Sequence, residues 1–288
     1  MPRLFKRVTI AGVGLIGGSL ALAARAAGLI GEVVGLGRGE DNLCTAQQRG
    51  IVDRYSHDPL DAARDADLLL VAVPVGAIAD VVRACASALR PGAVVSDVGS
   101  VKEVVLRDVE AQLPAGLSFV GAHPIAGTEE SGAAHAAADL FRGSRCILTP
   151  GRRAGADAVA KVRALWEGVG MRVDQMDAAR HDDVLACVSH LPHALAFSAV
   201  NALLDADATF ADFAGPSFRD LTRVAASSTE MWCDIFLANA AHVDRAITTF
   251  VAALEQLRHA IVRGDAAQIK ERLERAQAAR RQWSAARP

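Results

Sequence analysis

The glycine spacing Gly12-x-Gly14-x-x-Gly17 constrains the fold more than any other feature, and it lies between an apolar run and a run of small residues. In a strand–turn–helix unit the first glycine allows a tight turn and the second lets the backbone approach a pyrophosphate. The third lets the helix pack closely on the strand. We expect the strand over residues 8–11 and the helix over residues 15–27. The N–H groups that begin this helix would face the phosphates of a dinucleotide.

The same stretch also has features of a secretory signal peptide, because basic residues precede an uncharged run that ends in small residues. Each glycine, however, would cost a membrane-inserting helix about 1 kcal/mol relative to alanine. A second apolar strand is predicted at residues 32–36, where a βαβ unit requires one. We therefore interpret the segment as part of the folded domain. No later stretch is expected to be long and apolar enough to span a bilayer.

Strand and helix signals alternate through the first half of the chain. Apolar runs at residues 66–73 and 93–97 predict strands that are buried on both faces of a parallel sheet. After about Met176 only helical patterns remain. The sequence therefore predicts an α/β fold with a Rossmann-type dinucleotide-binding domain over residues 1–175. An all-helical domain over residues 176–288 would bind the substrate and form a homodimer.

Composition excludes several classes of function. The net charge of −2 gives no sign of a nucleic acid or an anionic membrane surface as a partner. The five cysteines are scattered and form no CxxC motif, which argues against a disulfide framework and against a zinc site. Free thiols, most of them buried, are typical of a reducing cytosol, so we expect a cytoplasmic protein that holds no metal.

The choice of nicotinamide cofactor depends on the residue at the end of the second strand. NAD sites usually place an acidic residue there, about 20 residues beyond the glycine motif, to bind the ribose 2′-hydroxyl. Here Gly37 occupies the position and Arg38 follows, so a 2′-phosphate would meet a cation. The sequence favours NADP over NAD, with the alternative that Arg38 is solvated and Glu40 or Asp41 binds the ribose. The expected cofactor-binding residues are Gly12, Gly14, Leu15, Ile16, Gly17, Gly37, Arg38, Val73, Pro74 and Asp97.

Ligands of open α/β sheets bind outside the carboxyl ends of the strands. Three polar residues are predicted to lie there, namely Asp97, Ser100 and His123. His123 directly follows a buried strand and lies among glycines. A neutral imidazole is a natural acceptor for a hydroxyl proton, so His123 is the strongest catalytic candidate.

The helical half contributes a second group of candidates. His190 and His193 share a helix face, and Pro192 would kink or start the helix between them. A zinc site would need a third ligand that the spacing does not supply, and a buried structural histidine is the alternative for each. Arg223 suits a carboxylate substrate, with a structural salt bridge to Asp220 as the alternative. The other histidines lie in polar contexts and are expected at the surface, namely His57, His135, His181, His242 and His259.

Six segments together resemble the prephenate/arogenate dehydrogenase family of tyrosine biosynthesis. They are "AGVGLIGGSLA", "DVGSVK", "GAHPIAGTEESG", "VSHLPHALAF", "FRDLTRVAASS" and "MWCDIFLAN", in the family's order over nearly the whole chain. The resemblance implies a Rossmann domain joined to a helical dimerisation domain. It also implies oxidative decarboxylation of prephenate or arogenate to 4-hydroxyphenylpyruvate or tyrosine, with the choice between the two substrates left open.

The resemblance also implies roles for individual residues. His123 would take the proton of the ring 4-hydroxyl, and Ser100 would orient that hydroxyl. Arg223 would bind the substrate carboxylate, and His193 would lie at the other end of the substrate or near the nicotinamide. Two further loop residues would line or gate the substrate pocket, namely Thr128 and Glu129.

Two other functions remain open at this point. A β-hydroxyacid-type dehydrogenase would use a lysine of the second domain, but the sequence has none between Lys161 and Lys270. A non-catalytic NADP-binding sensor would need the glycine motif without the polar residues of the predicted active site. Turnover of prephenate or arogenate separates an enzyme from such a sensor.

Overall fold

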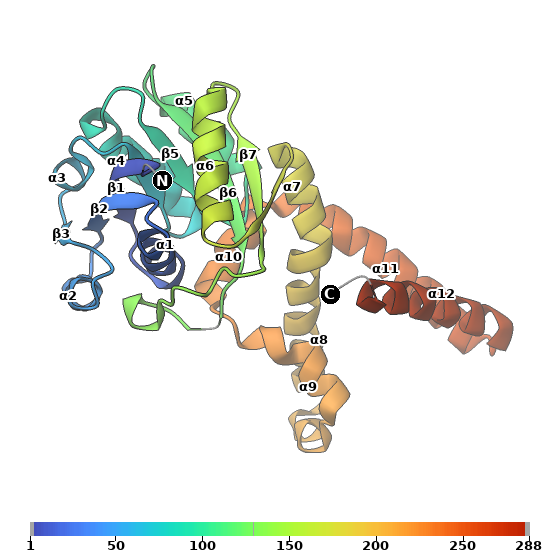
Figure 1. Ribbon diagram of the computed structural model, residues 1–288. Helices are drawn as coiled ribbons and strands as arrows, with labels where there is room; N and C mark the ends of the chain where they lie inside the picture. The colour runs from blue at the N-terminus through green and yellow to red at the C-terminus, as the bar shows by residue number, and fades with distance from the viewer. Residues whose placement is uncertain (1–2, 129, 286–288) are drawn as a thin grey trace. The chain divides into compact units, whose positions relative to one another are not determined.

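An eight-stranded sheet with the order β3-β2-β1-β4-β5-β6-β7-β8 organises the first half of the computed structural model, which describes residues 3–128 and 130–285 (Figure 1). Its first six strands have the order of a dinucleotide-binding sheet. Neighbouring strands are parallel except for β6 and β7, which are antiparallel. The strands are β1 (Phe5–Ala11), β2 (Ile30–Leu36), β3 (Arg54–Ser56), β4 (Leu68–Val71), β5 (Val94–Asp97), β6 (Ser118–Ile125), β7 (Arg145–Pro150) and β8 (Arg172–Gln175).

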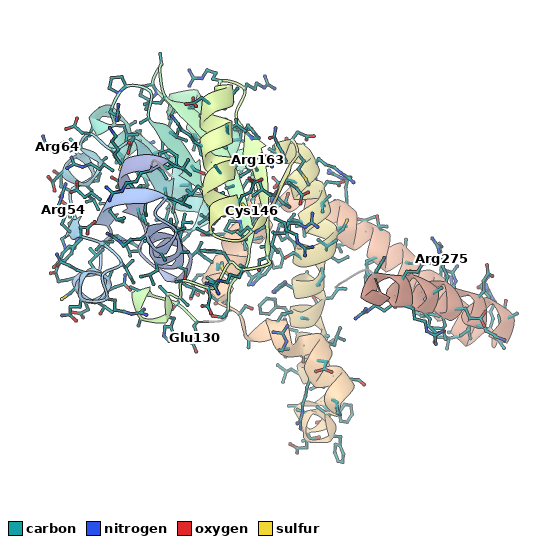
Figure 2. The ribbon with its side chains drawn as sticks, in the orientation of Figure 1. Arg54, Arg64, Glu130, Cys146, Arg163 and Arg275 are labelled. Carbon is teal, nitrogen blue, oxygen red and sulfur yellow. The ribbon has the colours of Figure 1, made fainter. Side chains whose placement is uncertain are left out.

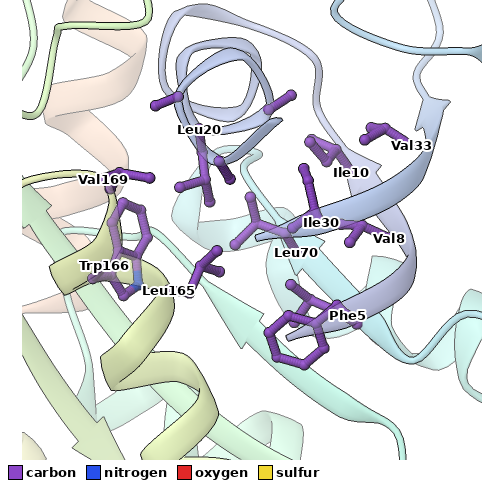
Figure 3. Packing of buried hydrophobic residues seen from close by; sticks show 14 of the residues in the cluster. Phe5, Val8, Ile10, Leu20, Ile30, Val33, Leu70, Leu165, Trp166 and Val169 are labelled. Atoms are coloured by element: carbon purple, nitrogen blue, oxygen red, sulfur yellow. The ribbon is translucent and has the colours of Figure 1, made fainter. Parts of the chain in front are cut away.

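Strand β4 shows why these apolar runs form a buried sheet. Leu68 and Leu70 point to one face, where they join a core with α1 (Leu15–Ala26) and α6 (Ala156–Gly168), seen in Figure 3. Leu69 points to the opposite face and packs with α3 (Pro59–Ala63), α4 (Ile78–Cys85) and α5 (Glu103–Gln112). Because alternate residues of a strand face opposite sides, a continuous apolar run fits a sheet that helices cover on both faces.

Charged side chains protect the open edge of the sheet at β3. Arg54 is placed 3.0 Å from Asp61 and 3.8 Å from Glu32, and Arg64 is exposed nearby (Figure 2). Cys146 of β7 lies instead in the core, with a free thiol. Charges at an edge strand discourage pairing with another sheet. Five free cysteines are present, of which only two are buried and two are exposed, so the expectation of mostly buried thiols is only partly met.

The second half of the chain is helical. A π-helical turn over Ala186–His190 separates α7 (Ala178–Leu185) from α8 (Leu191–Asp207), in whose first turn Pro192 lies. Proline lacks the N–H of a regular helical turn, and a π turn accommodates the interruption without ending the helix. The later helices are α9 (Pro216–Thr222), α10 (Thr229–Ala238), α11 (Ala240–Val262) and α12 (Ala266–Ala285).

The chain divides into two compact units, residues 1–240 and residues 241–288. Helices α7 to α10 thus belong to the same compact unit as the sheet, and the second unit consists of α12 and nearly all of α11. Gly264 ends α11 with a positive φ of 68° and leads into α12. The domain boundary predicted near residue 175 marks the change from sheet to helices in the sequence and stays a prediction.

The α/β fold class is confirmed, and three details differ from the sequence predictions. The three-residue strand β3 was not predicted, because it is too short to show a periodic pattern. Strand β7 runs antiparallel to β6, which local periodicity does not reveal. Residues 178–213 are long and apolar enough to cross a membrane by length and composition, so the expectation that no such stretch exists is wrong by these criteria.

Candidate active site

A cavity of about 750 Å³ opens where β1, β2 and β4 end. It is lined by the glycine-rich turn, by the residues after β2 and by those after β4. Ligands of doubly wound folds bind at this edge of the sheet. Six of the expected cofactor-binding residues line the cavity, namely Gly12, Gly14, Gly37, Arg38, Val73 and Pro74.

The glycine-rich turn has the geometry of a pyrophosphate site. Gly12 has a φ of 90°, and a Cβ there would stand 2.3 Å from the carbonyl oxygen of Ala72. A Cβ on Gly17 would stand 2.5 Å from the carbonyl oxygen of Gly12, so the helix packs closely on the turn. The space around Gly14 is open, and the first turn of α1 carries no acidic residue and no side-chain cap. Its first N–H groups can therefore bind phosphate oxygens.

Leu15 and Ile16, two more of the expected cofactor-binding residues, form the start of α1. Leu15 is buried, and the side chain of Ile16 packs against the core. Neither side chain lines the cavity, so any contact of these two residues with a dinucleotide would come from their backbone N–H groups.

A polar cluster stands after β2, where a dinucleotide would place its adenosine ribose. Tyr55 Oη donates a 2.6 Å hydrogen bond to Glu40 Oε1, and His57 Nε2 is 2.7 Å from Glu40 Oε2. His57 Nδ1 is 2.8 Å from the carbonyl oxygen of Gly37. Both partners of His57 accept hydrogen bonds, so both ring nitrogens donate and the ring is an imidazolium.

The charges of this cluster favour a cation beside the cavity. The hydrogen bond to Glu40 raises the pKa of His57, while hydrogen bonds from Tyr55 and His57 lower the pKa of Glu40. His57 and Arg38 both line the cavity, whereas the carboxylate of Glu40 is held by its two partners. His57 is exposed, as expected, and it also lines this cavity, which was not predicted from the sequence.

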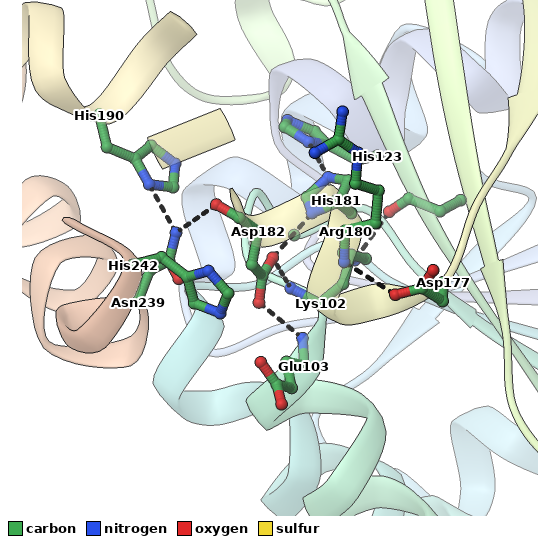
Figure 4. Close-up of polar contacts among 12 residues, drawn as sticks. Lys102, Glu103, His123, Asp177, Arg180, His181, Asp182, His190, Asn239 and His242 are labelled. Atoms are coloured by element: carbon green, nitrogen blue, oxygen red, sulfur yellow. Dashed lines mark hydrogen bonds and ion pairs between the residues drawn. The ribbon is translucent and has the colours of Figure 1, made fainter. Parts of the chain in front are cut away.

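A second polar group stands where β5 and β6 end (Figure 4). His123 Nδ1 is 2.8 Å from His181 Nε2, and His181 Nδ1 is 2.7 Å from Asp182 Oδ1. The Asp182 carboxylate also accepts the backbone N–H groups of Lys102 and Glu103, each at 2.8 Å. These contacts attach the middle of α7 to the β5–α5 connection and to the candidate catalytic histidine.

The prediction that His181 lies at the surface is therefore wrong, because its side chain is fully buried. The sequence around it is polar, and its neighbours Arg180 and Asp183 are indeed exposed and paired with each other. Only the packing of α7 against the end of the sheet turns His181 inward. The adjacent Asp182, equally buried, was missed for the same reason.

Asp97, a predicted cofactor contact, is the last residue of β5 and is fully buried. Its carboxylate accepts hydrogen bonds from Lys102 Nζ, from the N–H of Gly99 at 2.8 Å and from the N–H of Ala122 at 3.3 Å. Lys102 Nζ also donates to the carbonyl oxygen of Ala122 at 2.9 Å, directly before His123 in the chain. The buried pair thus shapes the turn that presents Ser100, which is half-buried.

The environment of His123 keeps its ring neutral. Burial lowers the pKa of His123 well below its usual value, and the neighbouring His181, Lys102 and His190 lower it further. The residue as a whole is half-buried. A neutral imidazole can accept a proton from a hydroxyl group.

His193 lies on α8, and Arg223 begins a turn, Arg223–Ala226, that packs against this helix. His193 Nδ1 is 2.9 Å from the carbonyl oxygen of Ser189, and its ring stacks on Trp232 with a centroid separation of 3.6 Å. Burial lowers the pKa of His193, and the charge of Arg223 lowers it further. Within residues 3–128 and 130–285, Arg223 forms no ion pair with Asp220, so the structural salt bridge considered as its alternative is not formed.

The remaining candidates have different surroundings. His190 is buried, with Nδ1 at 3.0 Å from Asn239 Nδ2, and burial lowers its pKa to about 4. Thr128 is exposed, and its hydroxyl accepts the N–H of Glu130 at 3.2 Å. Glu129 lies outside the described residues.

A cavity of this kind and a neutral histidine, both at the carboxyl edge of the sheet, are typical of a nicotinamide-dependent dehydrogenase of the Rossmann class. Comparison with known families is more specific. Residues 20–175 match the nucleotide-binding domain of prephenate dehydrogenase, and residues 177–275 match the dimerization domain of prephenate dehydrogenase. The chain belongs to the prephenate/arogenate dehydrogenase family and is an oxidoreductase of tyrosine biosynthesis.

Individual relatives agree with this assignment. The cyclohexadienyl dehydrogenase of Zymomonas mobilis is 37% identical over 281 residues, which are 96% of each chain. The crystal structure of A. aeolicus prephenate dehydrogenase with hydroxyphenyl propionate and NAD+ has 34% identity and a TM-score of 0.91, covering 96% of this chain and 98% of that one. Arogenate dehydrogenase of Synechocystis has 25% identity and a TM-score of 0.84, covering 96% and 99%.

Proposed function

We propose that the protein oxidatively decarboxylates prephenate, arogenate or both, and releases 4-hydroxyphenylpyruvate or tyrosine together with CO2. The observation that carries this proposal is the neutral, half-buried His123 near the C-terminal end of β6, next to the β5–α5 connection that holds Ser100. His123 accepts the proton of the ring 4-hydroxyl while Ser100 orients that hydroxyl. His123 lies near the C-terminal end of β6, and Ser100 follows the neighbouring parallel strand β5, which supports their action on one substrate atom.

The chemistry needs few protein groups. When bound, the oxidised nicotinamide supplies the acceptor for the hydride that leaves the ring carbon. Loss of CO2 from the opposite carbon makes the ring aromatic, which provides the driving force. The protein has to align the substrate and remove one proton.

Arg223 binds the side-chain carboxylate of the substrate, and His193 lies beside it at the same end. The turn Arg223–Ala226 packs against α8, which carries His193, and this supports their action at the same end of the substrate. An arginine fork suits a carboxylate, and a half-buried histidine can donate to or accept from a keto or amino group. Thr128 and Glu129 contribute from the loop after β6.

NADP is the favoured cofactor, and NAD is accepted. Gly37 stands where an NAD site carries a carboxylate, and two cations, Arg38 and His57, line the cavity at that point. Glu40, which could have served the ribose, is engaged by Tyr55 and His57. A 2′-phosphate would therefore meet positive charge without an unpaired carboxylate.

The protein acts as a cytoplasmic homodimer assembled through its helices, with the helical domain beginning near residue 176. Large apolar side chains are exposed within each compact unit, which supports an interface there. In the first unit they include Phe213, 87% exposed, and Leu237, 72% exposed, and in the second unit Val262, 74% exposed. The apolar run over residues 178–213 is explained by such an interface without a membrane.

Initial rates with prephenate or arogenate, each with NAD+ or NADP+, test the proposal through the absorbance of the reduced nicotinamide. Turnover in any combination supports the enzyme, and the pattern assigns its substrate and cofactor. A folded protein that binds the cofactor but turns over neither substrate would contradict the reaction and point to a sensor.

A further inference from the structure

The hydrogen bonds behind His123 have a defined direction. A carboxylate only accepts hydrogen bonds, so the 2.7 Å contact between Asp182 Oδ1 and His181 Nδ1 requires a proton on Nδ1 of His181. A neutral imidazole carries one proton, so Nε2 of His181 is then an acceptor. The 2.8 Å contact from His181 Nε2 to His123 Nδ1 must be filled by a proton on Nδ1 of His123.

We propose that His181 and Asp182 are positioning residues that hold His123 in the tautomer with its proton on Nδ1, so that Nε2 is the base. The inference rests on the proposed role of His123 in the reaction. In the Ser-His-Asp triad of hydrolases, a buried carboxylate likewise holds the catalytic histidine in one tautomer. Here the carboxylate of Asp182 acts on His123 through the imidazole of His181.

Asp182, which begins this series of hydrogen bonds, is itself held by several further hydrogen bonds. Asp182 is buried, and its two oxygens also accept the N–H groups of Lys102 and Glu103. The carbonyl oxygen of Asp182 accepts a 3.0 Å hydrogen bond from Asn239 Nδ2. Because Lys102 follows Ser100 by two residues, one carboxylate positions both groups that would contact the substrate hydroxyl.

The charge on His181 decides which tautomer His123 adopts. Protonation of His181 would place a proton on its Nε2, facing His123 Nδ1, and would drive His123 into the opposite tautomer with a blocked Nε2. Burial lowers the pKa of His181, and Lys102 lowers it further, while Asp182 and Asp97 raise it. The net effect is a lowered pKa, which keeps His181 neutral at neutral pH. His190 is the other titratable group that acts on this pair.

Two variants of His181 separate ordering of the tautomer from a purely structural role. We expect His181→Leu to lower kcat at least about 10-fold while KM for substrate and cofactor stays within about twofold, because only the base is disordered. His181→Gln keeps an acceptor oxygen within reach of His123 and should recover part of kcat. The acid limb of the pH profile of kcat for His181→Gln should also lose the contribution of His181. His259→Leu, an exposed position on α11, is the matched control.

A direct readout does not depend on activity. In the dimer labelled with ¹⁵N-histidine, long-range proton–nitrogen correlation spectra report which ring nitrogen carries the proton, and His123→Asn assigns the signals. We expect the Nδ1–H form of His123 in the native protein and a gain of the Nε2–H form in His181→Leu. An Nε2–H form in the native protein overturns the inference, as does an equal loss of kcat in both His181 variants.

The two proposals fail in different ways. Full activity of His123→Asn would remove His123 as the base and with it the proposed mechanism, whatever the spectra show. Loss of activity in His123→Asn together with native kcat in His181→Leu would leave the mechanism standing and overturn only the ordering by His181 and Asp182.

Discussion

The ammonium group of Lys102 is paired with the carboxylate of Asp97, and neither side chain is more than 1% exposed. The pair joins β5 to β6 directly under His123, through the backbone of Ala122. Removing one residue of a buried ion pair leaves the other charge without a partner and lowers the free energy of unfolding strongly. The same substitution in an exposed ion pair changes this free energy little.

The first prediction concerns this pair. We expect Lys102→Met to lower the free energy of unfolding by about 3–5 kcal/mol, because the Asp97 carboxylate is left buried and uncompensated. Chemical denaturation measures the change. Lys161→Met is the matched control, since Lys161 forms an exposed pair with Asp157, and it should have little effect. A native stability for Lys102→Met would show that water or another group compensates Asp97.

The second prediction concerns the proposed base. His123→Asn should keep the fold and cofactor affinity and lose turnover by about 10²–10⁴-fold, the range for a lost general base. Steady-state kinetics measures kcat, and fluorescence titration measures cofactor binding. His135→Asn, at an exposed histidine of the following loop, serves as the control. A kcat near the native value would remove His123 from the mechanism.

The third prediction concerns cofactor choice. Arg38→Ala should raise KM for NADP+ by about 10-fold or more, the equivalent of a charge-assisted hydrogen bond, and leave KM for NAD+ unchanged. The exposed Arg152 gives a control of equal charge outside the cavity. Equal effects on both cofactors would show that Arg38 contacts a part that NAD and NADP share.

The fourth prediction uses the pH dependence of His57. The hydrogen bond to Glu40 raises the pKa of His57, so the cation persists above the pH range of an ordinary histidine. We expect KM for NADP+ to increase as the pH rises through this pKa, because the 2′-phosphate loses a positive partner, while KM for NAD+ stays level. In His57→Gln the pH dependence should vanish. A profile unchanged by that substitution would assign the effect to another group.

The fifth prediction concerns the substrate carboxylate. Arg223→Ala should raise KM for the substrate by about 10–100-fold with a smaller change in kcat, as expected for a lost charged hydrogen bond. Asp220→Asn tests the neighbouring carboxylate and should leave KM near its native value. If KM were steady in Arg223→Ala, the arginine would have a structural role.

Local spacing predicts the parts of this protein whose conformation depends on neighbours in the chain. Gly12 and Gly17 specify the turn and the helix contact because only glycine fits a φ of 90° or a Cβ position 2.5 Å from a backbone oxygen. His123 was identified as a polar residue expected directly after a buried strand in a family motif, and the structure instead places it within β6, which continues to Ile125. These features hold in any fold that keeps the strand–turn–helix order.

Tertiary packing decided the rest. His181 was predicted at the surface and Asp182 was not singled out, yet both are buried because α7 packs against the end of the sheet, with His181 placed 58 residues from His123 in sequence. The burial of Lys102 and the antiparallel direction of β7 likewise depend on contacts between distant segments. A polar side chain can form its hydrogen bonds either with water or within a buried network. The residue type alone therefore does not reveal whether the side chain is exposed or buried. The sequence by itself determined the nucleotide-binding turn and the order of the fold, and only the tertiary structure decided which polar groups stand behind the base.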